Sequence, residues 1–305
     1  MTTTLVTGGL GFVGRYLVRR LAADGHRVIS YNRDFSESDD PSVVAVQGEL
    51  YDVPRLLRTL QEYEVERIAH TAAMSHPELS IDLPITTFTA NVEGTLHVLE
   101  AARLAGVRRV VNFSSECAYG DQETHLVQEE GAHLLPNTPY GVTKVATELM
   151  GRIYGRLYGV DVISLRITEV YGPGNPMPEV LREMIAAAVH GRPFRLDEGG
   201  EHRFQFVHAE DVARAAQAAL EVGDHGRAVY NITGGRQVTL REAAALVEKI
   251  LGKADLAIGP GHIPTLDRQG PYDITAARDE LGYVPQQSLE AGIASYADWL
   301  RDRRY

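Results

Sequence analysis

Short apolar runs alternate with segments of helical periodicity along most of the chain. Between the first two runs, Phe12 and Tyr16 repeat at a spacing of four, as do Val13, Leu17 and Leu21, which is typical of one helix face. A strand–helix–strand rhythm of this kind predicts right-handed βαβ crossovers and an α/β fold with a doubly wound parallel sheet. The predicted strands are Thr3–Val6, Arg27–Tyr31, Val43–Gln47, Arg67–His70, Arg108–Phe113, Asp161–Ile167 and Ala228–Asn231.

Helix ends are indicated by capping residues. The turn at Asp24-Gly25 should end the first helix, because glycine favours the position after a helix C-terminus. Asp52 can accept hydrogen bonds at the start of the next helix, and Pro54 suits its first turn. Asn91–Leu104 is predicted to form a third helix, closed by Gly106.

A change of character near Gly172–Pro176 suggests that the chain leaves the sheet there, because glycine and proline are concentrated in this segment. We expect residues 1–171 and 206–232 to form a dinucleotide-binding domain. Residues 172–205 and 233–305 should form a smaller substrate-binding lobe.

Composition narrows the function classes. The 305 residues are 44% hydrophobic and 23% charged, as in an ordinary globular protein, and 30 basic against 41 acidic residues leave a formal charge of −11. Such a charge argues against nucleic acid or an anionic membrane as a partner. A single cysteine, Cys117, excludes an internal disulfide framework and a multi-cysteine zinc site, and no metal is expected. With no targeting pattern or long apolar run, we expect a cytoplasmic enzyme.

The first strand is followed by a glycine-rich turn, Thr7–Gly14. Glycines at positions 8, 11 and 14 allow a tight turn, close approach to a pyrophosphate and close packing of helix on strand. The free N–H groups of the helix N-terminus then favour phosphate. Its position at the first strand–helix junction predicts a Rossmann-type site for NAD(P).

The second strand ends where such folds select NAD or NADP. An acidic residue at this point binds the adenosine ribose and repels a 2′-phosphate, but this chain carries Asn32 and Arg33. Asn32 can bond a ribose, and Arg33 either meets a 2′-phosphate or is a solvated loop charge. We expect NADP to be accepted as well as NAD. Glu49 and Leu50, after the third strand, should flank the adenine.

Tyr140 and Lys144 lie four residues apart, and therefore on one face of a helix. A tyrosine is a poor base at neutral pH, but a neighbouring lysine and a cationic cofactor lower its pKa. Ser115, after the fifth strand, can orient a substrate oxygen toward Tyr140. Together with the glycine turn, this set predicts redox chemistry at a carbinol or ketone.

With these motifs, the chain resembles the extended short-chain dehydrogenase/reductases of the NAD-dependent epimerase/dehydratase family. The resemblance implies that Tyr140 is the acid/base, that Lys144 is its partner and a ribose ligand, and that Ser115 orients the substrate oxygen. It also implies a homodimer built on a four-helix bundle, here from Asn91–Leu104 and Tyr140–Tyr158. The matching segments run from Thr7–Gly14 to Leu281–Pro285, and the cofactor contacts implied within them are Gly8, Gly11, Phe12, Val13, Ala72, Ala73 and Asn91.

The two residues that follow Ser115 depart from the family pattern. Family dehydratases carry an Asp-Glu pair where this chain has Glu116 and Cys117, so dehydration by that route is disfavoured. A related sugar-nucleotide epimerase uses a cysteine here as acid/base, and a thiol can exchange a proton beside a transient ketone. The alternative is that Cys117 is a small packing residue.

Residues that we expect to contact the substrate also depart from the family pattern. Glu169 replaces an asparagine that contacts substrate in sugar-nucleotide enzymes, and a carboxylate there repels a diphosphate or bonds the hydroxyls of another sugar. Arg203 and Arg268 are the remaining candidates for binding an anionic group, or else ordinary surface charges.

The leading hypothesis is an NAD(P)-dependent epimerase of a sugar or nucleotide-sugar that acts through a transient ketone. A simple sugar dehydrogenase or ketoreductase requires the same residues. A non-catalytic dinucleotide sensor would not need an intact tyrosine–lysine pair, so that pair counts against it.

Overall fold

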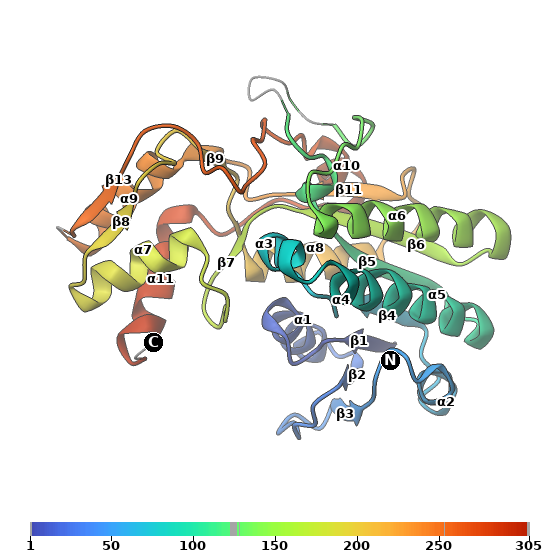
Figure 1. Ribbon diagram of the computed structural model, residues 1–305. Helices are drawn as coiled ribbons and strands as arrows, with labels where there is room; N and C mark the ends of the chain where they lie inside the picture. Colours follow the sequence, from blue (N-terminus) through green and yellow to red (C-terminus); the bar gives the residue numbers. More distant parts are fainter. Residues whose placement is uncertain (1, 123–126, 128, 253, 304–305) are drawn as a thin grey trace.

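A seven-stranded parallel sheet forms the centre of the computed structural model, which describes residues 2–122, 127, 129–252 and 254–303 (Figure 1). The strand order is β11-β6-β5-β4-β1-β2-β3, with the reversal of winding between β1 and β4. Every predicted strand is confirmed, with ends that agree within two residues. The strands are β1 (Thr3–Thr7), β2 (Arg27–Asn32), β3 (Val43–Gln47), β4 (Arg67–His70), β5 (Arg109–Ser115), β6 (Asp161–Ile167) and β11 (Val229–Ile232).

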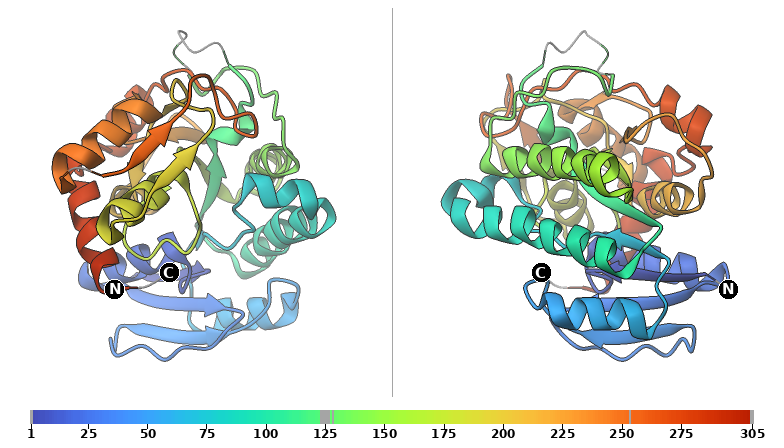
Figure 2. Two further views of the ribbon diagram at one scale, coloured as in Figure 1. Left: turned by 60° about the vertical axis from the view of Figure 1, so that its left-hand side comes forward. Right: turned by 90° about the vertical axis from the view of Figure 1, so that its right-hand side faces the viewer.

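Helices cover both faces of this sheet, which explains why β1 and β5 are buried along their whole lengths. One face is covered by α1 (Phe12–Ala23), α8 (Ala209–Glu221) and α10 (Thr275–Leu281). The other is covered by α2 (Val53–Glu62), α5 (Gly94–Ala105) and α6 (Pro139–Tyr158), and Figure 2 shows α5 and α6 side by side. The Asp52 carboxylate caps α2 by accepting a hydrogen bond from the Arg55 N–H at 3.0 Å, as predicted.

The helix predicted over Asn91–Leu104 is present as α5 with a π-helical turn at its start, and two helices that were not predicted precede it. Two short helices, α3 (Pro77–Asp82) and α4 (Pro84–Phe88), begin at prolines, which suit a first helical turn. A π-helical turn, η1 (Thr89–Glu93), then leads into α5. Gly106 ends α5 in the left-handed conformation at φ +71°, as predicted.

A smaller lobe beside the sheet has its own hydrophobic core (Figure 1). Three helices enclose this core: α7 (Val180–His190), α9 (Leu240–Leu251) and α11 (Leu289–Arg301). Three pairs of short strands accompany them: β7 (Val170–Tyr171) with β10 (Val207–His208), β9 (Arg203–Phe204) with β12 (Val238–Thr239), and β8 (Phe194–Leu196) with β13 (Leu256–Ile258). Among the described helices, none is long and apolar enough to cross a bilayer.

Candidate active site

A cleft of about 1060 Å³ lies at the carboxyl ends of the parallel strands and extends to the smaller lobe. The loops after β1, β4, β5 and β6 all contribute to its wall. Ligands of open α/β sheets bind at this edge, beside the reversal of strand order. The cleft therefore stands where the glycine turn predicts a dinucleotide.

The glycine turn is packed so tightly that side chains are excluded. A Cβ atom on Gly14 would lie 2.0 Å from the Gly8 carbonyl oxygen, and one on Gly9 would lie 2.4 Å from Ser30 Oγ. Gly8 itself has φ +71°, which side-chain-bearing residues rarely adopt. The turn leaves the N-terminus of α1 open toward the cleft, which suits a pyrophosphate.

At the adenosine end, Asn32 is buried and holds the turn in place. Its Oδ1 accepts a hydrogen bond from the Leu10 N–H at 2.8 Å, and its Nδ2 donates to Ser30 Oγ at 2.9 Å. Arg33 also lines the cleft, and its side chain is 76% exposed, 3.9 Å from the Asp34 carboxylate. Among the described residues that line this end, Arg33 is the exposed cation, whereas much of the hydrogen-bonding capacity of Asn32 is used within the protein.

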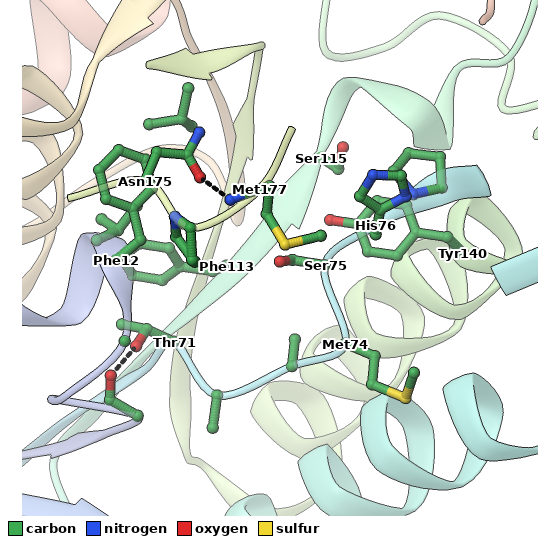
Figure 3. Close-up of a pocket in the computed structure, with 18 of the residues that line it drawn as sticks. Phe12, Thr71, Met74, Ser75, His76, Phe113, Ser115, Tyr140, Asn175 and Met177 are labelled. Carbon is green, nitrogen blue, oxygen red and sulfur yellow. Dashed lines mark hydrogen bonds between the residues drawn. The ribbon is translucent and has the colours of Figure 1, made fainter. Parts of the chain in front are cut away.

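The part of the cleft that the glycine turn lines is called the cofactor half, and the part next to the smaller lobe is called the substrate half. Tyr140, Lys144 and Ser115 converge where the cofactor half meets the substrate half. Figure 3 shows Tyr140 and Ser115 on the same side of the cleft, together with His76. Lys144 Nζ donates a hydrogen bond to the Phe113 carbonyl at 2.7 Å and lies 5.3 Å from the centre of the Tyr140 ring. This bond fixes the ammonium beside the phenol, on the helix face that the four-residue spacing predicted.

Burial dominates the electrostatics of this group. Burial raises the pKa of the Tyr140 hydroxyl above its ordinary value, and a hydrogen bond with Ser115 partly opposes this rise. Burial lowers the pKa of Lys144 to about 8, so this amine is still mostly charged at pH 7. A cation beside the phenol is what ionisation of Tyr140 requires.

Next to this centre, three acidic or weakly acidic groups lie close together in the substrate half. Glu116 is only 5% exposed, and burial together with the charge of Glu169 raises its pKa. Burial and the charge of Glu78 raise the pKa of Glu169 to about 7. Burial and Glu116 also raise the pKa of the Cys117 thiol, which keeps it protonated at neutral pH. All three side chains line the cleft.

The sequence pattern of the NAD dependent epimerase/dehydratase family matches residues 4–233. The chain belongs to this family. Among curated relatives, a UDP-glucose 4-epimerase of Mycolicibacterium smegmatis is 33% identical, with 98% of this chain and 99% of that protein covered. A dTDP-glucose 4,6-dehydratase of Streptomyces antibioticus is 31% identical, with 98% and 92% covered.

Solved structures of family members share the whole fold. MoeE5 in complex with UDP-glucuronic acid and NAD superposes with a TM-score of 0.89 at 30% identity, covering 98% of this chain and 99% of that one. UDP-glucose 4-epimerase of Thermotoga maritima with UDP-glucose gives 0.89 at 28% identity, with 99% of both chains covered. The chain is thus an enzyme of the extended short-chain dehydrogenase/reductase type, as its motifs indicated.

Most of the residues singled out from the sequence lie together in this cleft of the family fold. The exceptions within the described residues are Asn91, Arg203 and Arg268, which do not line it. The residues brought together are Gly8, Gly11, Phe12, Val13, Asn32, Arg33, Glu49, Leu50, Ala72, Ala73, Ser115, Glu116, Cys117, Tyr140, Lys144 and Glu169.

Each exception has a structural explanation. The buried amide of Asn91 bonds both the N–H and the carbonyl of Met74, and also Thr143 Oγ1, so it holds the loop after β4 against α6. Arg203 is exposed in β9, where the side chain of the next residue, Phe204, is buried in the cleft wall instead. Arg268 lies beside the Asp121 carboxylate, 3.8 Å away at the surface.

Three residues that support the site belong to no sequence motif. The fully buried Ser80 accepts a hydrogen bond from the Tyr140 N–H at 3.0 Å and so helps to position the helix that carries the phenol. His76 caps α3, and Glu179 caps α7. His76 and Ser80 lie at the start of and within α3, whose six residues are too few to show a helical period, and Glu179 stands just before α7; the prolines at 77 and 178 were the available clues.

Proposed function

We propose that this protein is a nicotinamide-dependent sugar epimerase that acts through a transient ketone. The observation that carries the proposal is the buried group of Tyr140, Lys144 and Ser115 beside a glycine turn too tight for side chains. A nicotinamide held beside Tyr140 would supply the hydride transfer. The protein's own part is to remove and return the hydroxyl proton.

Tyr140 is the proton acceptor in this mechanism. Ser115 holds the substrate oxygen and the phenol together, while Lys144, fixed by the Phe113 carbonyl, favours the phenolate. Because burial makes the free phenol a weak acid, the positive charge of Lys144 and of an oxidised nicotinamide is needed for ionisation. Proton transfer is therefore coupled to cofactor binding.

Binding of NADP as well as NAD is proposed from the adenosine end. Arg33 is exposed on the cleft wall, and no carboxylate stands at position 32 to repel a 2′-phosphate. A homodimer is proposed on separate grounds. Large apolar side chains are exposed on α4, α5 and α6: Ile85, Phe88, Leu96, Leu149, Ile153 and Leu157.

Replacement of Tyr140 by phenylalanine tests the mechanism. Loss of a general acid–base should lower turnover by roughly 10²- to 10⁴-fold while cofactor binding is retained. Tyr154→Phe is the matched control, because Tyr154 is on the same helix but bonds Glu100 away from the cleft. Near-native turnover in Tyr140→Phe would show that the proton acceptor is another group.

A simple dehydrogenase or ketoreductase is the second candidate, because it uses the same residues. Stoichiometry separates the two functions. An epimerase forms product with no net change in the cofactor, whereas a dehydrogenase reduces one cofactor for each product molecule.

A further inference from the structure

A small cavity of about 30 Å³ adjoins the substrate half of the cleft. Glu116, Glu169 and Phe204 are among the residues that line both spaces. Its volume matches one water-sized polar group. The wall consists of Pro77, Glu116, Cys117, Thr138, Glu169, His202, Phe204, Thr265, Leu266, Asp267 and Gln269. Three of these side chains are carboxylic acids, and none of the described ones is a lysine or an arginine.

Two buried side chains of this wall carry an oxygen atom without a hydrogen-bond partner among the described residues. Glu116 is 5% exposed; hydrogen bonding with Gln269 and Tyr272 partly opposes the rise that burial causes in its pKa, and its Oε2 atom has no partner within hydrogen-bond distance among the described residues. Gln269, 8% exposed, has an unpartnered Oε1. Buried acceptors normally have partners, because an unmade hydrogen bond is costly. A group with several N–H donors and a positive charge would satisfy both atoms.

The rest of the substrate half has no counter-charge for phosphate. Among the described lining residues, the only lysine or arginine side chains are Arg33, at the adenosine end, and Lys144, beside Tyr140. Side chains alternate along a strand, so β9 places Phe204 in the wall and turns Arg203 outward. The substrate half instead carries the side chains of Glu78, Glu116, Glu169, Glu179 and Glu183, of which Glu183 is paired with Arg182 at 2.7 Å. Among its described residues, such a wall offers no lysine or arginine to bind a diphosphate.

We propose that the substrate is an amine-bearing sugar or cyclitol without a phosphate or nucleotide, and that its ammonium group occupies the cavity between Glu116, Glu169 and Asp267. This inference rests on the proposed redox function and specifies its substrate class. The raised pKa values of Glu116, Glu169 and Asp267 agree with it, since burial and then neighbouring carboxylates raise them. An ammonium among them would favour their ionised forms.

Calorimetry on the NAD-loaded protein at pH 7 tests the proposal with glucosamine, glucose and UDP-glucose as probes. Glucosamine and glucose differ only in an amine against a hydroxyl. A charge-assisted hydrogen bond should make glucosamine bind at least about tenfold more tightly than glucose. UDP-glucose should bind most weakly.

Substitutions in the cavity test which side chains cause the preference for glucosamine over glucose. Glu116→Gln should abolish most of the preference for glucosamine, and Asp267→Asn provides an independent removal of charge from the same cavity. Glu198→Gln is the matched control, because Glu198 is exposed and does not line either space. Its preference should equal that of the native protein.

Equal binding of glucosamine and glucose, absence of glucosamine binding, or tightest binding of UDP-glucose would each overturn the proposal. The redox function is judged separately. Epimerisation or oxidation of UDP-glucose that depends on Tyr140 would support that function while overturning the amine assignment. A glucosamine preference that Glu116→Gln removes, in a protein that neither epimerises nor oxidises any sugar, would support the assignment and overturn the redox function.

Discussion

Glu169→Gln should stabilise the protein at alkaline pH and leave it unchanged in acid. The carboxyl of Glu169 has its pKa raised from 4.5 to about 7, mainly by burial, and its charge in turn raises the pKa of Glu116 and of Glu179. The folded state therefore holds the proton more tightly than the unfolded chain. Below pH 4.5 both states are protonated, so the group has no effect on stability. As the pH rises toward 7 the folded state loses stability, and above 7 the loss is complete.

The size of this loss follows from the shift. A change of roughly 2.5 pKa units corresponds to about 3.4 kcal/mol as an upper limit. Because Glu169 is only half-buried, solvent screening reduces this to about 1.5–2 kcal/mol. At about 2.1 cal/mol/K per residue, a chain of this length has an unfolding entropy near 0.6 kcal/mol/K, so the melting temperature should rise by about 3 °C.

Thermal unfolding of the native protein and of Glu169→Gln at pH 8 and pH 4 measures the effect. A neutral amide removes the charge and keeps the shape of the side chain. Exposed Glu198→Gln removes the same charge elsewhere and should shift the melting temperature equally little at both pH values. A variant less stable than the native protein at pH 8, or one shifted by the same amount at both pH values, would refute the reasoning.

Three further changes test other parts of the site. Asn32→Asp should weaken NADP binding far more than NAD binding in fluorescence titrations, since a carboxylate can keep the Leu10 N–H bond while repelling a 2′-phosphate; equal losses would mean that position 32 does not sense the ribose. If Cys117 exchanges a substrate proton, product formed in deuterated water should carry deuterium beside the carbinol carbon, and Cys117→Ala should abolish this labelling. Unlabelled product from the native protein would exclude that role. The raised pKa of the thiol, which keeps it protonated, favours the unlabelled result. Glu148→Gln should lower the free energy of unfolding in urea by about 3–5 kcal/mol, because it leaves Arg166, bonded at 2.7 Å and 2.9 Å, buried without its carboxylate; a loss below about 1 kcal/mol would show that the pair is dispensable.

Local features predicted most of the fold and the cofactor half. The order of strands and helices follows from alternating periodicities, and the positions of Gly8, Gly11 and Gly14 reflect a constraint that acts within a few residues. The same holds for Tyr140 and Lys144, since residues four apart share a helix face whatever surrounds them. These predictions needed no knowledge of long-range packing.

The substrate half depended on contacts that no local pattern contains. Glu116 and Glu169 follow neighbouring strands, β5 and β6, and only the parallel pairing of those strands brings the two carboxylates to one cavity. Burial then sets their charge, because desolvation acts on the folded arrangement and not on the residue type. Whether an arginine is available for an anion was likewise undecided until strand β9 turned Arg203 outward. The amino-acid sequence by itself thus determined the sheet, the glycine turn and the tyrosine–lysine pair, and the tertiary structure alone decided the charge and shape of the substrate site.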